Sequence, residues 1–291
     1  METKELIEKL EKDGEHIVIS RMKKPAYVEK AIEGDSILIG AVVDVETTGL
    51  THGKDKIIEL GIVRFEFNKD GRIFRTLGEF DALEDPGQPI PQEVTDITGI
   101  NDEMVKGKAI DTQEVDRLMK DVVVVICHNS SFDRPFLDDR FPVFQKIGFA
   151  CSYAQLPWGR EGVPGKKLEY LAYEYRFFYG AHRASDDCWA LLNVLKETLP
   201  KSGERVLKNL LDTARKDTVL LEAKGAPFEG KDLLKARKYH WNGQKRVWEK
   251  EFETEELNEE EAWLKTHLFD GDLPNLPRTK VRPVDRFKSK S

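Results

Sequence analysis

The chain has 291 residues, 40% of them hydrophobic and 34% charged, and it carries a formal net charge of −7 at pH 7. This length suits one large or two smaller domains with buried cores, and no apolar stretch approaches the roughly 20 residues needed to cross a bilayer. The charged first residues do not resemble a secretory signal, and the three cysteines fit free thiols in a reducing compartment, so we expect a cytoplasmic protein without membrane contact.

The first part of the chain shows no catalytic pattern. Residues 1–37 predict an N-terminal extension with a short helix, the strand-like stretch HIVIS and a linker. The stretches AVVDVE, IIELGIVRFEF and RIFRTLGEF then predict three strands, and NKDG supplies the turn between the last two. A proline-rich connection leads from there to short helical pieces between Glu93 and Met104.

Strands and helices continue to alternate up to about residue 200. VVVVIC is an apolar run typical of a strand covered on both faces, and SFDRPFLDDRF has helical spacing. A final helix is indicated by one apolar stripe, which comprises Ala184, Cys188, Leu191, Leu192, Leu195 and Leu199. Residues 38–200 therefore predict an α/β domain with a mixed sheet flanked by helices.

The remainder of the chain differs in composition. Residues 201–220 predict a connecting helix, and residues 221–272 predict a small α+β accessory domain with a strand, a helix, a hairpin around Asn242-Gly243 and an acidic helix. Residues 273–291 are rich in proline, arginine and lysine, and this composition predicts a disordered tail.

Four carboxylates and one histidine stand out in the α/β domain. Asp44 and Glu46 lie two apart in a strand and point to the same face, where like charges repel and are costly to desolvate. Asp133 and Asp187 lie near the starts of two helices, and His182 precedes Asp187 by five residues. Two magnesium or manganese ions would offset the repulsion and serve phosphoryl displacement, and a nearby histidine can accept a proton from water.

The stretches DVETTG, HNSSFD and HRASDD resemble the three motifs of the DEDDh, or DnaQ-like, 3′–5′ exonucleases, which include the epsilon proofreading subunit of DNA polymerase III. PIPQEVTDITGINDEMV also resembles the epsilon-like branch. Over residues 38–200 the resemblance implies an RNase H-like fold. It implies that Asp44, Glu46, Asp133 and Asp187 bind the metal ions, and that His182 is the general base, with Glu46 beside it in the catalytic set.

The resemblance also implies a groove for a single-stranded 3′ end. Its expected contacts to the terminal nucleotide are Thr47, Thr48, Gly49, Leu50 and Asn129. Gly49 has the alternative of being only a turn residue. Phe132 fits either base stacking or, at helical spacing with Phe136, the core.

The accessory domain holds a local excess of positive charge, which matters because the net charge of the chain is negative. Residues 224–250 contain eight Lys or Arg against three Asp or Glu, interleaved with aromatic residues. Trp241, Lys245, Arg246 and Trp248 are therefore candidate contacts to single-stranded nucleic acid. The alternative is that the two tryptophans form the core of this small domain.

We expect a two-metal 3′–5′ exodeoxyribonuclease that releases 5′-mononucleotides from single-stranded DNA, of a proofreading or repair type. One alternative is an RNA-trimming exonuclease of the RNase T or oligoribonuclease kind, because selectivity between DNA and RNA lies in groove contacts. Another is a non-catalytic scaffold that docks on a DNA polymerase or repair complex. The complete set of acidic motifs argues against the scaffold, and membership of a polymerase complex stays open.

Overall fold

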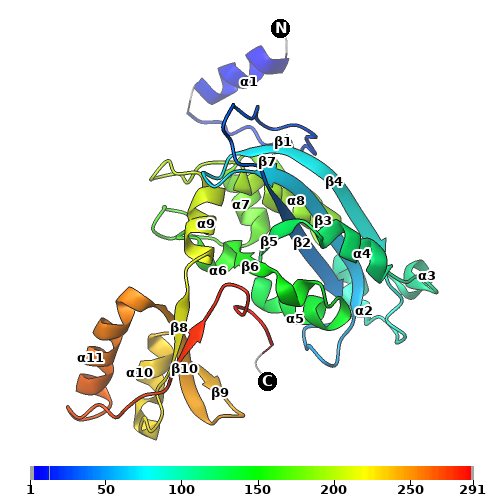
Figure 1. The fold of residues 1–291 in the computed structure, drawn as a ribbon. Helices are drawn as coiled ribbons and strands as arrows, with labels where there is room; N and C mark the ends of the chain where they lie inside the picture. Colours follow the sequence, from blue (N-terminus) through cyan, green and yellow to red (C-terminus); the bar gives the residue numbers. More distant parts are fainter. Residues whose placement is uncertain (1–2, 13, 290–291) are drawn as a thin grey trace. The chain divides into compact units, whose positions relative to one another are not determined.

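The computed structural model describes residues 3–12 and 14–289, which form two compact units (Figure 1). The first unit comprises the described residues up to Ala214 together with those from Phe287 onward, and the second comprises Arg215–Arg286. Each unit has its own β-sheet and its own hydrophobic core. No described helix is long and apolar enough to cross a membrane.

A five-stranded mixed sheet forms the centre of the first unit, with the strand order β4-β3-β2-β5-β6. Its strands are β2 (Leu38–Thr47), β3 (Ile57–Phe67), β4 (Ile73–Leu83), β5 (Val122–Cys127) and β6 (Gly148–Cys151). β2, β3 and β4 pair antiparallel, whereas β5 is parallel to both β2 and β6. This topology confirms the predicted α/β class with a mixed sheet.

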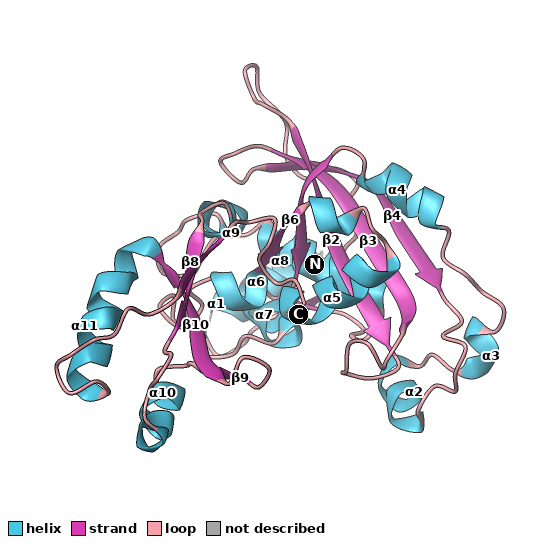
Figure 2. Ribbon diagram, turned by 60° about the horizontal axis from the view of Figure 1, so that its bottom comes forward, coloured by secondary structure: helices cyan, strands magenta, loops and turns pink. Residues whose placement is uncertain are grey.

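Helices flank this sheet (Figure 2). They are α2 (Gln92–Thr98), α3 (Asp102–Val105), α4 (Thr112–Met119), α5 (Ser130–Arg140), α6 (Ser152–Gln155), α7 (Leu168–Glu174), α8 (Ala184–Leu195) and α9 (Val206–Ala214), with a short 3-10 turn, η1 (Phe144–Lys146). The N-terminal extension contributes one more helix, α1 (Thr3–Lys12). A short strand of the N-terminal extension, β1 (Ser20–Arg21), pairs parallel with β7 (Phe177–Phe178). The three cysteines of the chain are buried and free.

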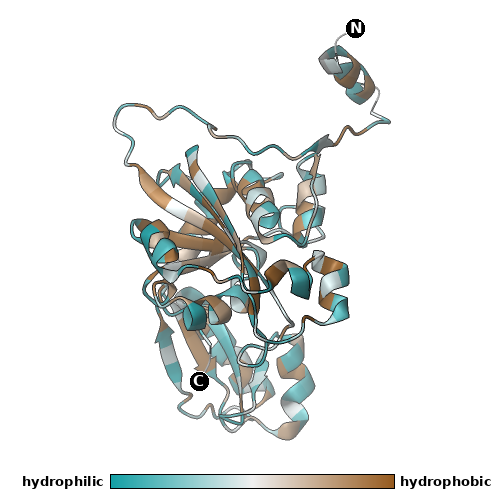
Figure 3. Ribbon diagram, turned by 90° about the vertical axis from the view of Figure 1, so that its right-hand side faces the viewer, coloured by the Kyte–Doolittle hydropathy of each residue, from teal (hydrophilic) through white to brown (hydrophobic). Residues whose placement is uncertain are grey.

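Strand alternation along β2 gives the two faces of the sheet different roles. Val42 packs in the cluster that contains the apolar stripe of α8, whereas Val43 and Val45 pack in the cluster that contains residues of α5. Because side chains alternate, Asp44 and Glu46 point to the same side as Val42, toward α8. The long hydrophobic stretches of these strands are visible in Figure 3.

The helix expected over residues 201–220 is shorter than predicted and belongs to the first unit. It is α9, and its residues Val206, Leu207 and Leu210 are buried in the same cluster as the stripe of α8. An amphipathic helix with a fully buried face is part of a core, so α9 is not a free connection between the two units.

The second unit is a small α+β fold with a four-stranded antiparallel sheet in the order β11-β8-β10-β9. Its elements are β8 (Thr218–Glu222), η2 (Phe228–Gly230), α10 (Lys231–Ala236), β9 (His240–Asn242), β10 (Val247–Glu253), η3 (Thr254–Glu256), α11 (Leu257–His267) and β11 (Arg278–Val281). β9 and β10 form the expected hairpin around Asn242-Gly243. Buried leucines from β8, α10 and α11 build the core of this unit.

The prediction of a disordered tail over residues 273–291 is wrong for the part that the structure describes. β11 lies within this stretch and pairs with β8. Leu276 is buried, and the guanidinium of Arg286, itself buried, donates a hydrogen bond to Glu251. A composition rich in proline and cationic residues is typical of disorder. It does not reveal the few tertiary contacts that anchor this stretch.

Candidate active site

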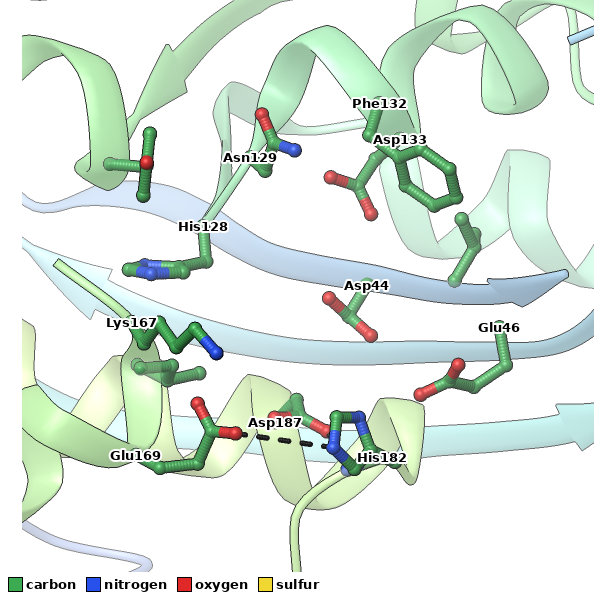
Figure 4. Close-up of a pocket in the computed structure, with 13 residues that line it drawn as sticks. Asp44, Glu46, His128, Asn129, Phe132, Asp133, Lys167, Glu169, His182 and Asp187 are labelled. Carbon is green, nitrogen blue, oxygen red and sulfur yellow. Dashed lines mark hydrogen bonds and ion pairs between the residues drawn. The ribbon is translucent and has the colours of Figure 1, made fainter. Parts of the chain in front are cut away.

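A cavity of about 460 Å³ opens at the end of β2 in the first unit (Figure 4). Side chains from β2, from the starts of α5, α7 and α8, and from the intervening loops converge on it. Its lining comprises Asp44, Val45, Glu46, His128, Asn129, Phe132, Asp133, Tyr153, Lys167, Leu168, Glu169, His182 and Asp187. The structure thus brings together all five residues that the motifs single out as metal ligands or base.

Three of the carboxylates form one tight group. Asp44, Glu46 and Asp187 each offer an oxygen, and these oxygens all lie within 4.8 Å of one another. Asp133 lies outside this group but interacts electrostatically with both Asp44 and Asp187, and its carboxylate accepts a hydrogen bond from the backbone of Val45. Hence the fourth carboxylate is fixed to the strand that carries the first two.

The negative charge of this group is not balanced by the protein. Among the residues that the structure describes, no lysine or arginine forms an ion pair with any of the four carboxylates. Burial raises the pKa of Glu46 to about 8, of Asp133 to about 7 and of Asp187 to about 6, and the neighbouring carboxylates add to the increase for Glu46 and Asp133. Burial, followed by the charges of Asp133 and Asp187, raises the pKa of Asp44 well above its usual range.

This donor set fits divalent cations. Carboxylate oxygens are the ligands that magnesium and manganese prefer, and a cation among them removes both the repulsion and the cost of burial. Asp44, Glu46 and Asp187, with Asp133 close by, are the residues that could hold such ions.

His182 lies at the rim of the cavity, immediately before α8. Its φ of 69° is in the left-handed region, which is uncommon for a residue other than glycine. Its backbone N–H donates to Asp187 Oδ2 over 2.8 Å, and its ring Nε2 lies 3.9 Å from Glu169 Oε1. The side chain is 52% exposed. Asp187 therefore holds the backbone of the histidine while the ring stays accessible to solvent.

A network behind α8 fixes the position of this loop. Glu59, fully buried on β3, accepts hydrogen bonds from the Arg183 guanidinium and, over 2.8 Å, from the Ala184 N–H. The helix also rests directly on Gly61, where an added Cβ would lie 2.4 Å from the Ala184 carbonyl carbon. Asp186, the neighbour of Asp187, pairs instead with Lys24 of the N-terminal extension over 3.0 Å. Only Asp187 is turned into the cavity.

The expected substrate contacts are only partly brought together. Asn129 lines the cavity, whereas Thr47 and Thr48 are buried beside it and use their hydroxyls in internal hydrogen bonds to Gly49 O and to Asp55. Leu50 follows them and is 85% exposed.

Gly49 is needed because an added Cβ would lie 2.7 Å from Asp55, and its backbone does not have a positive φ. Close packing, rather than a turn, is the structural reason for glycine here. Phe132 combines both roles considered for it, because it lines the cavity and also packs on Phe136 with ring centroids 5.3 Å apart.

Several residues of the site carry no signal in the sequence. Tyr179 donates its hydroxyl to Asp187 Oδ1 over 2.7 Å, and Lys167 and Glu169 come from the start of α7. His128 also lines the cavity, although no residue in the sequence forms a recognisable motif with it. Its Nε2 lies 2.8 Å from the Lys166 carbonyl oxygen, and burial lowers its pKa to about 4, so the ring is neutral at pH 7.

Comparison with known proteins agrees with this geometry. The family described as RNase_T, Exonuclease, matches residues 41–195. The chain is 32% identical over 153 residues to DNA polymerase III subunit epsilon of Treponema pallidum, which covers 50% of this chain and 68% of that protein. It is 37% identical over 113 residues to DNA polymerase III PolC-type of Halalkalibacterium halodurans, which covers 37% of this chain.

The chain spans only 7% of that PolC-type protein, and 11% of a PolC-type relative from Clostridium perfringens that is 30% identical over 177 residues. Among solved structures, Exonuclease X in complex with 5′ overhanging duplex DNA is similar at a TM-score of 0.44 and 24% identity, over 60% of this chain and 98% of that chain. The family match covers more than half of the chain and includes every carboxylate of the cavity. The chain belongs to the RNase T exonuclease family, and its α/β unit is related to DNA polymerase III epsilon.

Proposed function

We propose that this protein is a metal-dependent 3′–5′ exonuclease that releases 5′-mononucleotides from single-stranded 3′ ends, with DNA as the preferred substrate. The observation that carries the proposal is a group of carboxylates without a protein cation, in which Asp133 is buried and Asp44, Glu46 and Asp187 are half-buried. Such a group is costly to keep in a fold unless a ligand of opposite charge belongs there.

The four carboxylates would hold two magnesium or manganese ions. Bound divalent cations supply Lewis-acid stabilisation to the oxygens of a phosphodiester during displacement. The tight group of three carboxylates is consistent with shared ligands, and the attachment of Asp133 to the Val45 backbone places the fourth ligand with little freedom.

His182 is proposed to accept the proton of the attacking water. Its ring is half exposed at the rim of the cavity, where solvent can reach it, and its backbone is tied to Asp187. The water oxygen forms the new bond to phosphorus, the bond from phosphorus to the 3′-oxygen of the preceding nucleotide breaks, and a 5′-mononucleotide leaves. Glu169 lies on the Nε2 side of the ring and would keep the imidazole oriented toward the cavity.

Further side chains and backbone groups would position the nucleic-acid strand. Asn129 and Phe132 line the cavity on the α5 side and would contact the terminal nucleotide, the amide by hydrogen bonding and the ring by stacking. Leu50 is a large apolar side chain at 85% exposure directly after β2, and it would wedge against the last bases. The remaining expected contacts are Thr47, Thr48 and Gly49. They would contact a nucleotide through backbone groups, because the two threonine hydroxyls already donate hydrogen bonds within the protein.

DNA is preferred as substrate because the relatives reported above carry the names DNA polymerase III subunit epsilon and DNA polymerase III PolC-type. An RNA-trimming enzyme is the second candidate, since no residue of the cavity has a geometry that selects for or against a 2′-hydroxyl. Docking on a DNA polymerase or repair complex is compatible with either activity.

Degradation of oligonucleotides labelled at the 3′ or the 5′ end tests this proposal. With Mg²⁺ or Mn²⁺, we expect a 3′ label to be released at once as a mononucleotide, while a 5′ label shortens stepwise. EDTA should stop both reactions, and parallel DNA and RNA strands measure the preference. Absence of metal-dependent degradation of either polymer would overturn the proposal, and faster degradation of RNA would replace DNA as the substrate.

A further inference from the structure

The second unit contains a pair of tryptophans, one of which packs against the core while the other lies at the surface. Trp241 of β9 and Trp248 of β10 are directly opposite each other in the antiparallel register, and their rings meet edge to face with centroids 5.5 Å apart. Trp248 packs against the core of the unit, whereas Trp241 is 51% exposed. The half-buried Trp248 packs against the exposed indole and restricts its orientation, so Trp241 presents a flat surface at low entropic cost.

The position of Trp241 makes its indole accessible. β9 is the edge strand of the sheet and has only three residues (Figure 1). Alternation along β10 places Trp248 and Glu249 on opposite faces, and Glu222 is paired with Glu249 in the register. The two carboxylates of this region therefore lie on the face opposite to the tryptophans.

The carboxylates near the hairpin are neutralised within the unit. Glu249, which is fully buried, accepts from His240 over 2.8 Å, and Lys245 bridges Glu222 at 2.7 Å and Glu249 at 3.9 Å. Their charge is thus not available to repel an anion from the tryptophan face.

Two cations close to Trp241 in the sequence or in the same hairpin have no such partner among the described residues. Arg246, in the turn between β9 and β10, and Lys238, just before β9, form no ion pair with the residues that the structure describes. Both have a left-handed backbone, with φ of 52° and 66°, so their positions are set by tight turns. An exposed indole, with one free cation in the turn of its hairpin and another three residues before it, offers the groups that bind a base and its neighbouring phosphates.

We propose that the β9–β10 hairpin is a second nucleic-acid-binding surface, which holds single-stranded DNA or RNA without sequence preference. A base stacks on Trp241, and Arg246 and Lys238 contact the adjoining phosphates. Lys245 has a structural role, because its ammonium group is engaged by Glu222 and Glu249. This surface goes beyond the proposed active site, and none of its residues line the catalytic cavity.

Binding of a fluorescent 30-nucleotide oligothymidylate to the full chain, followed by anisotropy in EDTA, tests the surface without cleavage. Trp241→Ala is expected to weaken binding about 5- to 150-fold, because stacking contributes about 1–3 kcal/mol per base. Trp241→Phe should restore much of the affinity. Lys238→Ala/Arg246→Ala should lower the logarithmic salt dependence by about 1.4, or about 0.7 for each lost phosphate contact.

Two controls separate binding from folding and from catalysis. Tyr27→Ala removes an aromatic side chain of 60% exposure from the other unit and should bind as the unaltered chain does. Thermal unfolding should be unchanged by Trp241→Ala, since its side chain is half exposed. If Trp241→Ala and Lys238→Ala/Arg246→Ala bind the 30-mer with unchanged affinity and salt dependence, the proposal is wrong, whether or not the chain cleaves DNA.

Discussion

The two units both bury carboxylates, but they treat them differently. In the second unit, fully buried Glu249 is paired with His240 and Lys245, and Glu260 accepts hydrogen bonds from both Nε and Nη2 of Arg237. In the cavity of the first unit, four carboxylates lie together without an ion-pair partner among the described residues, and their pKa values rise. Burial of an acid is therefore no sign of function by itself.

The comparison also holds inside the first unit. Glu59 lies on β3 directly opposite Glu46 in the register, and it is fully buried, whereas Glu46 is half-buried. It is fully engaged by Arg183 and the Ala184 N–H. A buried acid that has only a structural role can be stabilised by a cation beside it. The unpaired group is the part for which we propose a bound cation.

The largest effect should come from a change in the unpaired group. Asp44→Asn or Asp187→Asn is expected to reduce hydrolysis of a 3′-labelled oligonucleotide by about 10³-fold or more, because each change removes charge that holds the ions. The matched control is Glu222→Gln in the second unit, which should keep full activity. Normal turnover by purified Asp44→Asn would show that the carboxylates do not hold a catalytic metal.

A change at His182 should be smaller and of a different kind. His182→Asn removes the proposed proton acceptor and is expected to lower kcat by about 10²–10⁴-fold. All four carboxylates remain, so the affinity for Mn²⁺ should stay unchanged in calorimetry. A large loss of Mn²⁺ affinity would instead make His182 a ligand or a structural residue.

Replacing the cation of a buried ion pair should lower the free energy of unfolding, and not only the rate of hydrolysis. Arg183→Met leaves Glu59 buried without its cation and should cost about 3–5 kcal/mol of unfolding free energy. Arg237→Met should act similarly on Glu260 in the second unit. Arg75→Met provides the contrast and should destabilise far less, since Arg75 pairs with Glu66 from the surface, where its side chain is 57% exposed.

These stability differences are measured by urea unfolding in EDTA. Glu59→Gln combined with Arg183→Met should recover part of the loss, because the buried charge is then gone. If Arg183→Met and Arg75→Met have the same free energy of unfolding, the buried pair of Arg183 and Glu59 does not contribute the stability that we expect of it.

The pH dependence of the metal-free protein follows from the raised pKa values. A carboxyl whose folded pKa lies above its unfolded pKa binds more protons in the folded state, so stability falls as pH rises between the two. For Asp187, Asp133 and Glu46 this interval runs from about 4 in the unfolded chain to about 6, 7 and 8. In EDTA, the urea midpoint should therefore decline from pH 5 to pH 8, and the decline should be shallower in Asp44→Asn.

Much of this account could be predicted from the sequence. The alternation of VVDVE, the apolar run VVVVIC and the stripe of α8 reflect local periodicity, and the five predicted metal and base residues are the ones that line the cavity. The unexpected elements have weaker patterns: α4 is short and polar, β6 has four residues, and α7 follows a loop. β11 was missed because its residues RTKV are short, polar and at a sheet edge.

Supporting residues could not be predicted, because their role depends on tertiary contacts. Glu59 reaches Arg183 across 124 positions, and Tyr179 reaches Asp187 through a loop that has no periodicity. The same limit applies to the tryptophan pair. A single sequence shows Trp241 and Trp248 as equivalent, and only the register and the packing reveal that Trp248 is half-buried against the core while Trp241 is exposed.

Urea unfolding of the unaltered chain and of Asp44→Asn at pH 8, each in EDTA and in Mg²⁺, tests the central claim most directly. In EDTA, Asp44→Asn should be at least as stable as the unaltered chain, because it removes an unpaired buried anion. Mg²⁺ should raise the midpoint of the unaltered chain and have much less effect on the variant. A loss of about 3 kcal/mol in the variant in EDTA, with equal responses of both proteins to Mg²⁺, would contradict the claim that these carboxylates are kept unpaired for divalent cations.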